Sequence, residues 1–139
     1  MATFTKFQPM VENLAEKVFN LGTDTLKVML SNTAPTNTFG TKSQITEISA
    51  GNGYTAGGQQ ATQVSSAQTG GTYKLVCSDV TFAASGGTMA TFRYAILYDD
   101  TAANDELIGY WDYGTGVSLG DGESFVVDFN ATNGVLQIS

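Results

Sequence analysis

Alternating apolar and polar positions run through most of the chain after residue 22, and this period of two predicts β-strands. In the clearest run, residues 89–98, one face carries Ala90, Phe92, Tyr94, Ile96 and Tyr98. Runs of Gly, Asn, Asp, Ser and Thr separate the alternating segments, as is typical of turns. The expected strands are 25–30, 45–48, 59–68, 73–82, 88–98, 106–113, 123–129 and 134–138. About eight short, closely spaced strands predict a β-sandwich or a barrel.

Two of these segments carry further information. Residues 59–68 contain few large apolar side chains, which favours a strand at the edge of a sheet. The apolar face changes phase between Cys77 and Val80, so we expect a β-bulge near Ser78 and Asp79.

One segment, residues 9–21, has the spacing of an amphipathic helix instead. Its apolar stripe consists of Val11, Leu14, Val18 and Leu21. Pro9 suits the first helical position, and Gly22 is placed to end the helix in a left-handed conformation. A single helix of this length is marginal in water, so its stripe must lie on another surface.

The pattern therefore divides the chain into residues 1–22, an N-terminal arm with its helix, and residues 23–139, a β-sandwich within one domain overall. Phe4 and Phe7 extend the apolar strip of the arm. Two sheets already cover each other in a sandwich, so the strip is surplus to that core. Two alternatives stay open: the arm packs on a neighbouring subunit, or it caps its own sandwich.

The more apolar face of each strand predicts the core. The expected core residues are Leu26, Val28, Phe82, Phe92, Tyr94, Ile96, Trp111, Phe125, Val127 and Phe129. In the aromatic run 110–113, Trp111 is expected inside, whereas Tyr110 is the better candidate for the surface.

Composition narrows the function. Charged residues make up 14% of the chain, the net charge is −7, and the six basic residues form no cluster. Nucleic acid and anionic membranes are therefore unexpected partners. No apolar stretch is long enough to span a membrane, and the N-terminus lacks an apolar signal core, so we expect synthesis in a cytoplasm. The single cysteine, Cys77, has no partner for an intrachain disulfide and is expected to be buried.

No motif indicates catalysis. The chain has no His to serve as a base for a Ser or Cys nucleophile. The Gly-rich run 51–58 is not followed by the Lys and Ser or Thr of a phosphate-binding loop, so we expect turns there, with Tyr54 as a possible anchor. From Asp99 onward the EF-hand spacing fails at Thr101 and Ala103, and the acidic residues are expected in solvated turns, a weak Ca²⁺ site between loops being the alternative. We expect no enzyme activity, no cofactor and no metal.

The order of several segments resembles a known family. These segments are Gly22-Thr23-Asp24-Thr25-Leu26-Lys27-Val28-Met29-Leu30-Ser31-Asn32-Thr33-Ala34-Pro35, Gly51-Asn52-Gly53-Tyr54-Thr55-Ala56-Gly57-Gly58, Val80-Thr81-Phe82-Ala83-Ala84, Tyr94-Ala95-Ile96-Leu97-Tyr98-Asp99 and Leu107-Ile108-Gly109-Tyr110-Trp111-Asp112-Tyr113-Gly114. Together with the Phe-containing N-terminal helix, they look like the small virion structural proteins of tailed double-stranded DNA phages. Among these, the chain most resembles capsid decoration, or cement, proteins.

The resemblance implies a jelly-roll-like β-sandwich that self-associates into a homo-oligomer and binds the major capsid protein on the outside of the assembled head. It transfers no ligand or catalytic residue. The alternative is a carbohydrate- or receptor-binding head-fibre or tail protein of the virion. From the residues themselves, the candidates for contact with a partner are Phe4, Phe7, Val11, Leu14, Val18, Tyr54 and Tyr110.

Overall fold

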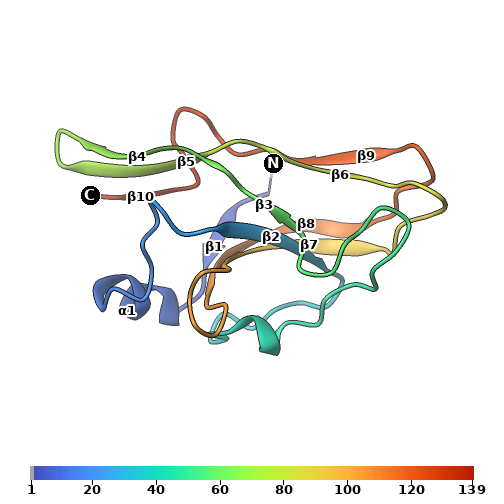
Figure 1. Ribbon diagram of the computed structural model, residues 1–139, viewed down its shortest axis with the longest axis horizontal. Helices are drawn as coiled ribbons and strands as arrows, with labels where there is room; N and C mark the ends of the chain where they lie inside the picture. The colour runs from blue at the N-terminus through green and yellow to red at the C-terminus, as the bar shows by residue number, and fades with distance from the viewer. Residues whose placement is uncertain (1) are drawn as a thin grey trace.

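The structure, a computed structural model, describes residues 2–139 and is mainly β, with antiparallel sheets in two layers (Figure 1). The lower layer of Figure 1 is one sheet with the order β1-β8-β7-β2-β3, made of β1 (Phe4–Lys6), β8 (Leu107–Val117), β7 (Phe92–Asp99), β2 (Leu26–Ser31) and β3 (Gln59–Gln60). The upper layer holds β4 (Gln63–Thr69), β5 (Thr72–Cys77), β10 (Leu136–Ile138), β6 (Val80–Ala83) and β9 (Ser124–Val127). This sandwich-like arrangement confirms the fold class expected from the alternation.

The upper layer is built around one interrupted strand. β5 pairs with β4 and β10, whereas β6 pairs with β9. Between β5 and β6, the Ser78 amide donates to the Thr62 carbonyl, and the Asp79 carboxylate accepts the Phe129 amide at 2.9 Å. The change of phase in the sequence thus marks a break between two strands, where a bulge within one strand was expected.

The centre of the lower sheet is buried on both faces. One face, together with the upper layer, forms a large core that includes Phe92. The other face carries Tyr94, Ile96 and Tyr98, which are covered by Phe7 and by side chains of the segment that crosses below the sheet between β2 and β3 (Figure 1). The register between β7 and β8 shifts between Phe92 and Tyr94. This shift places the two side chains on opposite faces, so the expectation that they share a face is wrong.

The expected core is otherwise confirmed with one adjustment. All the predicted residues are buried except Phe125, which is partly buried and packs edge-on against Phe92 and Tyr113, with ring centroids 5.2 and 4.8 Å apart. The predicted strand 45–48 is absent: the short 3₁₀ helix η1 (Lys42–Gln44) and a single bridge between Ser31 and Glu47 occupy this region.

The helix is shorter than expected. α1 (Pro9–Ala15) ends before Lys17, which takes the left-handed conformation at φ 66° that was expected of Gly22. Val18 and Leu21 therefore lie beyond the helix. Burial explains the early end, because Phe19 and Leu21 turn into the main core, where they are 4% and 5% exposed.

The N-terminal arm belongs to its own domain. β1 pairs with β8 so that Phe4 lies opposite Trp111, and the Phe7 amide donates to the Ile108 carbonyl at 3.1 Å. Sequence patterning missed this strand because three residues are too few to show a period. Within one copy of the protein, the structure places the arm on its own sandwich.

Candidate functional site

Two of the seven candidate contact residues are interior anchors. Phe7 is fully buried, with its ring centroid 5.2 Å from that of the half-buried Tyr110. Tyr54 is 3% exposed, donates its hydroxyl proton to Glu47 at 2.6 Å and accepts the Leu30 amide at 3.1 Å. Burial, and then the bond to Glu47, raise the pKa of Tyr54 far above its ordinary value. Neither Phe7 nor Tyr54 offers a surface to a partner, because both are needed inside the fold.

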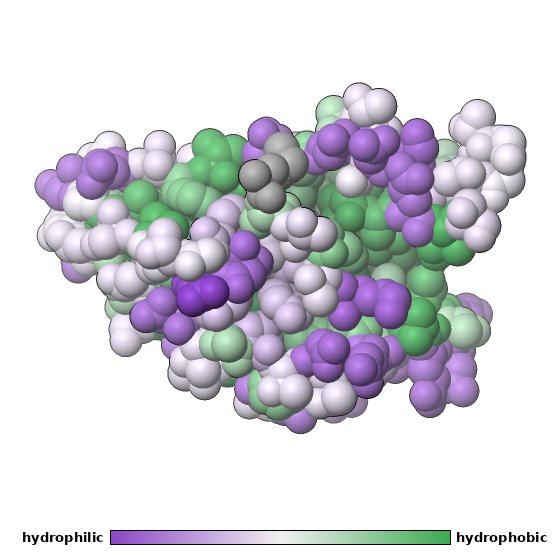
Figure 2. All heavy atoms as spheres, turned by 180° about the vertical axis from the view of Figure 1, so that it is seen from behind, coloured by the Kyte–Doolittle hydropathy of each residue, from purple (hydrophilic) through white to green (hydrophobic). Residues whose placement is uncertain are grey.

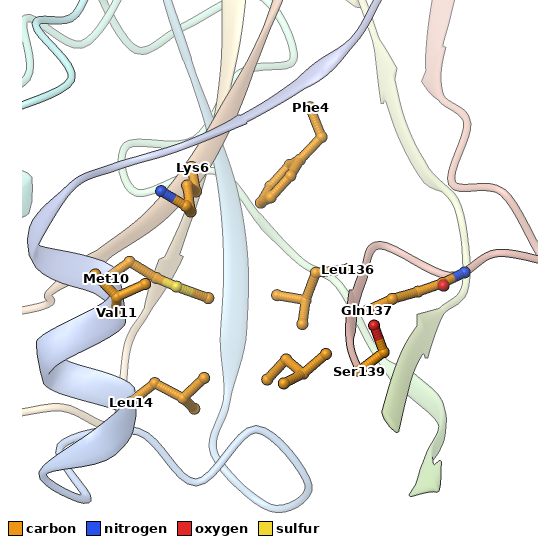
Figure 3. A pocket seen from close by; sticks show the side chains of 9 residues that line it. Phe4, Lys6, Met10, Val11, Leu14, Leu136, Gln137 and Ser139 are labelled. Atoms are coloured by element: carbon orange, nitrogen blue, oxygen red, sulfur yellow. The ribbon is translucent and has the colours of Figure 1, made fainter. Parts of the chain in front are cut away.

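Three other candidates lie at or beside an open groove, which we call the terminal groove. It has a volume of about 660 Å³ and is lined by Phe4, Lys6, Met10, Val11, Leu14, Leu136, Gln137, Ile138 and Ser139 (Figure 3). Hydrophobic side chains gather in the hollow on the right of the space-filling view, which is the side of α1 and β10 (Figure 2). Sequence patterning indicated Phe4, Val11 and Leu14 but not the C-terminal half of the lining.

The terminal groove exists because the two layers do not close on this side. β1 is the outermost strand of the lower sheet, and β10 is the outermost strand of its three-stranded sheet. Neither outer edge pairs with another strand within residues 2–139. α1 flanks the opening, and the groove leaves Val11 52% exposed and Ile138 44% exposed. Apolar side chains beside unpaired backbone groups are the combination that a partner strand can cover.

A second, smaller depression continues the groove around the end of the sandwich. Its volume is about 340 Å³, and it shares Leu14 and Ile138 with the terminal groove. Lys17 and Tyr73 contribute to its wall. Val18 lines neither hollow; it is half-buried and packs against the main core.

Only some of the basic side chains form ion pairs with acidic residues among residues 2–139. Lys27, Lys42 and Arg93 pair with Asp100, Asp105 and Asp112 at 3.2, 3.8 and 2.7 Å, respectively. Within the described chain, the other three cations, Lys6, Lys17 and Lys74, take part in none of these ion pairs. Lys6 and Lys17 are exposed and line the terminal groove and its continuation.

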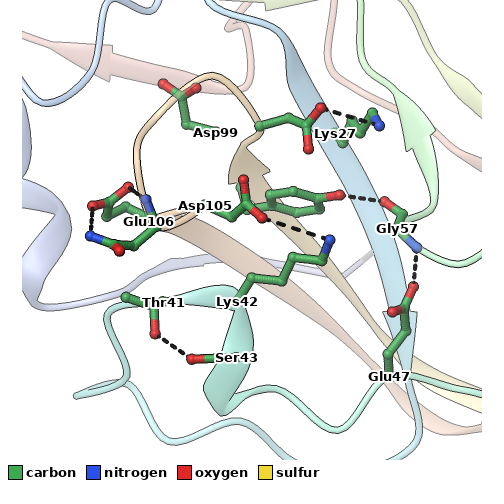
Figure 4. Close-up of polar contacts among 12 residues, drawn as sticks. Lys27, Thr41, Lys42, Ser43, Glu47, Gly57, Asp99, Asp105 and Glu106 are labelled. Carbon is green, nitrogen blue, oxygen red and sulfur yellow. Dashed lines mark hydrogen bonds and ion pairs between the residues drawn. The ribbon is translucent and has the colours of Figure 1, made fainter.

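A polar cluster below the sheet fixes the Gly-rich loop (Figure 4). The Tyr98 hydroxyl donates to the Gly57 carbonyl at 2.6 Å, and Glu47 accepts the Gly57 amide at 2.5 Å. The Lys42 ammonium lies 4.9 Å from the centroid of the Tyr98 ring, where a cation is attracted to the π face. Gly57 and Gly58 have φ of 90° and 77°, which confirms the expected turns. These contacts tie the loop to the sheet, and beside them a polar depression of about 450 Å³ opens to solvent.

One acidic residue is buried, although the sequence suggested solvated turns. Asp99 is fully buried at the end of β7, and its Oδ1 accepts the amides of Thr101 and Ala102 at 2.9 and 3.1 Å. Its Oδ2 has no hydrogen-bond donor among the described residues, and the Asp24 carboxyl lies within hydrogen-bonding reach. Two carboxylates can bond to each other only if one holds a proton. Burial, and then the contact with Asp24, raise the pKa of Asp99 to about 7.

In the part of the chain that the structure describes, no three His, Cys, Asp or Glu side chains come together as a group that could hold a metal ion. None of the described helices combines the length and the apolar character needed to cross a membrane. Comparison of the chain with protein-family models, with curated proteins and with solved structures found no match.

Proposed function

We propose that the chain is a structural protein of a tailed-phage virion, a jelly-roll-like decoration protein that binds the outside of the assembled head and bridges capsid subunits. The observation that carries this proposal is the terminal groove, an apolar opening between two free strand edges, with the exposed Lys6 in its lining and the exposed Lys17 in its continuation. The resemblance of the sequence to cement proteins supplies the virion setting.

The use of polar side chains supports a function based on contacts. Lys42, Glu47 and Tyr98 hold a loop on the sheet, and Arg93 binds Asp112 across two strands. Cys77 is buried, and burial raises the pKa of its thiol to about 11, which keeps the thiol protonated and unreactive. These polar side chains thus stabilise the fold. The terminal groove, in contrast, stays open to a partner.

The physical properties of the surface also suit a protein that covers a lattice. A net charge of −7 opposes precipitation of the free protein. Many weak contacts made in parallel on a repeated lattice give avidity without a strong single interface. A rigid β domain with an open apolar groove can make such a contact in every subunit.

Particle labelling tests the proposal. Antibody against the purified protein should co-sediment with virions of the phage that encodes the chain, and gold-labelled antibody should decorate the heads. Particles without the protein should bind it again, and Val11→Asp in the terminal groove should weaken this binding. Val64→Asp is the matched control, because Val64 is 68% exposed on β4 and lies outside the groove. Protein that never sediments with virions would overturn the proposal.

The polar depression beside Lys42, Glu47 and Asp105 favours a second candidate, a carbohydrate- or receptor-binding protein of a head fibre or tail. Carboxylate, ammonium and amide groups at one opening are suited to the hydroxyl groups of a sugar. Gold label on tails or fibres, together with a glycan-array signal that Asn104→Ala abolishes, would replace the decoration role with this one.

A further inference from the structure

We propose that the terminal groove binds a second copy of this chain, which inserts the acidic, apolar β9 segment around Val126. The inference deepens the self-association that the resemblance implies, and it rests on the proposed function for its setting. Its test uses the purified protein alone, so the two can fail separately.

The receiving surface is apolar in its walls and basic at its rim. Phe4, Leu14 and Leu136 form part of the lining, and Val11 and Ile138 remain about half exposed. The outer edges of β1 and β10, which pair with no other strand among residues 2–139, lie beside these side chains. A strand that enters the groove can therefore bury apolar area and pair its backbone in one contact.

The charges at the rim indicate an acidic occupant. Lys6 and Lys17 are exposed and make no ion pair with residues 2–139, although the chain has 13 acidic and 6 basic residues. Glu12 lies on α1 and Glu16 directly follows it, but neither lines the groove or its continuation. Lysines that the fold leaves unpaired next to an apolar wall attract carboxylates, and an interface that removes water strengthens this attraction.

The chain itself carries a segment that fits. Val126 on β9 is 45% exposed, and its exposed acidic neighbours are Glu123 and Asp128. Neither acid forms an ion pair within the described residues, and β9 pairs only with β6 there, which leaves its other edge free. Val64 is more exposed and shares a depression with Asp79 and Asp128, but its own strand, β4, carries no acidic residue. Charge therefore selects β9 over β4 as the inserted segment.

The two surfaces have different residues, so the contact is heterologous. β9 lies towards one end of the sandwich, and α1 lies towards the other (Figure 1). A heterologous contact repeats from copy to copy and yields a ring if the rotation closes or an open chain if it does not. Either product would present several copies to a capsid at once.

Charge reversal tests the pairing. The mass of the wild-type protein, followed by sedimentation equilibrium, should rise with concentration above the 14.6 kDa of one copy. The variants Lys6→Glu/Lys17→Glu and Glu123→Lys/Asp128→Lys should each weaken association at least tenfold. An equimolar mixture of the two variants should restore it, because each reversed surface then meets its complement. Lys74→Glu is the matched control, because Lys74 lines neither hollow of the groove.

Three results would overturn the inference. The first is a wild-type protein that stays monomeric into the millimolar range. The second is association that both double variants leave unchanged. The third is a mixture of the two double variants that fails to associate, although each variant has the wild-type circular dichroism spectrum and urea midpoint. Val126→Asp should also abolish association. A protein that is monomeric in solution yet labels phage heads would refute only the inference and leave the proposed function in place.

Discussion

Asp99→Asn should remove a pH dependence that the wild-type fold acquires from a buried carboxyl pair. In the wild type, Oδ1 of Asp99 accepts two backbone amides, whereas Oδ2 faces the Asp24 carboxyl without a donor between them. Asparagine keeps the acceptor at Oδ1 and places an NH₂ donor where Oδ2 was. The variant therefore has at every pH the hydrogen bond that the wild type has only when the pair holds a proton.

The sign and the size of the effect follow from linkage. The pKa of Asp99 is about 7 in the folded protein, against an ordinary value of 3.8. Between these two pH values the folded state holds a proton that the unfolded state has released, so stability falls as pH rises from about 4 to 7 and is flat above. A difference of about three pKa units corresponds to at most about 4 kcal/mol.

The remaining charged groups near Asp99 do not produce this slope. Asp100 is paired with Lys27 at 3.2 Å, and Asp24 is the charged group that helps to raise the pKa of Asp99. Arg93 lowers the pKa of Asp112, and this pair acts in the opposite sense, since its contribution is lost as pH falls through the acidic range. The descent between pH 4 and 7 therefore belongs to Asp99.

Urea unfolding at pH 4, 5.5, 7 and 8 measures the effect. The wild-type midpoint should fall across this series, and Asp99→Asn should flatten it and be more stable than the wild type at pH 8 by about 1–4 kcal/mol. Asp128→Asn, on an exposed carboxyl, should keep the wild-type slope. A wild-type midpoint that rises from pH 4 to 7 would refute the reasoning. Stabilisation by Ca²⁺ at pH 8 that Asp99→Asn lacks would place a cation, not a proton, between the carboxylates.

Three further predictions concern stability and access. Phe7→Ala should lower the free energy of unfolding by about 3–5 kcal/mol in urea, because it empties a fully buried ring site, whereas Val11→Ala should cost less than about 1 kcal/mol; equal losses would contradict the assigned burial. Gly58→Ala should cost more than about 4 kcal/mol, because a Cβ there would collide with the Val28 carbonyl at a φ of 77°; a wild-type thermal melt would disprove the close approach. Cys77 should react with a thiol reagent only at the rate of domain opening, so its rate should climb with urea; rapid reaction in native buffer would show an accessible thiol.

The sequence was sufficient to predict those features that show a clear alternation of apolar and polar residues. Alternation predicted the β class and nearly all of the core, because each strand carries one apolar face. The face of Tyr94 could not be predicted, since the register shift beside Phe92 arises from pairing with β8. The left-handed residue after the helix was assigned to Gly22 on intrinsic preference, but burial of Phe19 and Leu21 places it at Lys17.

Only the part of the candidate site that lies in a periodic segment could be predicted from the sequence. Val11 and Leu14 were named because they share a helical stripe, but Leu136 and Ile138 come from the other end of the chain and carry no local signal of contact with the arm. The burial of Asp99 could not be predicted either, because an acidic residue at the end of a strand is typical of the start of a solvated turn. Its two amide donors, Thr101 and Ala102, do form such a turn, but the contact with Asp24 closes it inside the fold.

The pairing of β1 with β8 also constrains the order in which the protein can fold. Phe4 and Trp111 are partners from opposite ends of the chain, and the closure of so large a loop is entropically costly before other contacts shorten it. During synthesis the first strand must wait, unpaired, until β8 has left the ribosome, although its residues emerged first. The β1–β8 pairing can therefore form only after β8 has been made, and the terminal groove takes its shape only after β10 has been made as well.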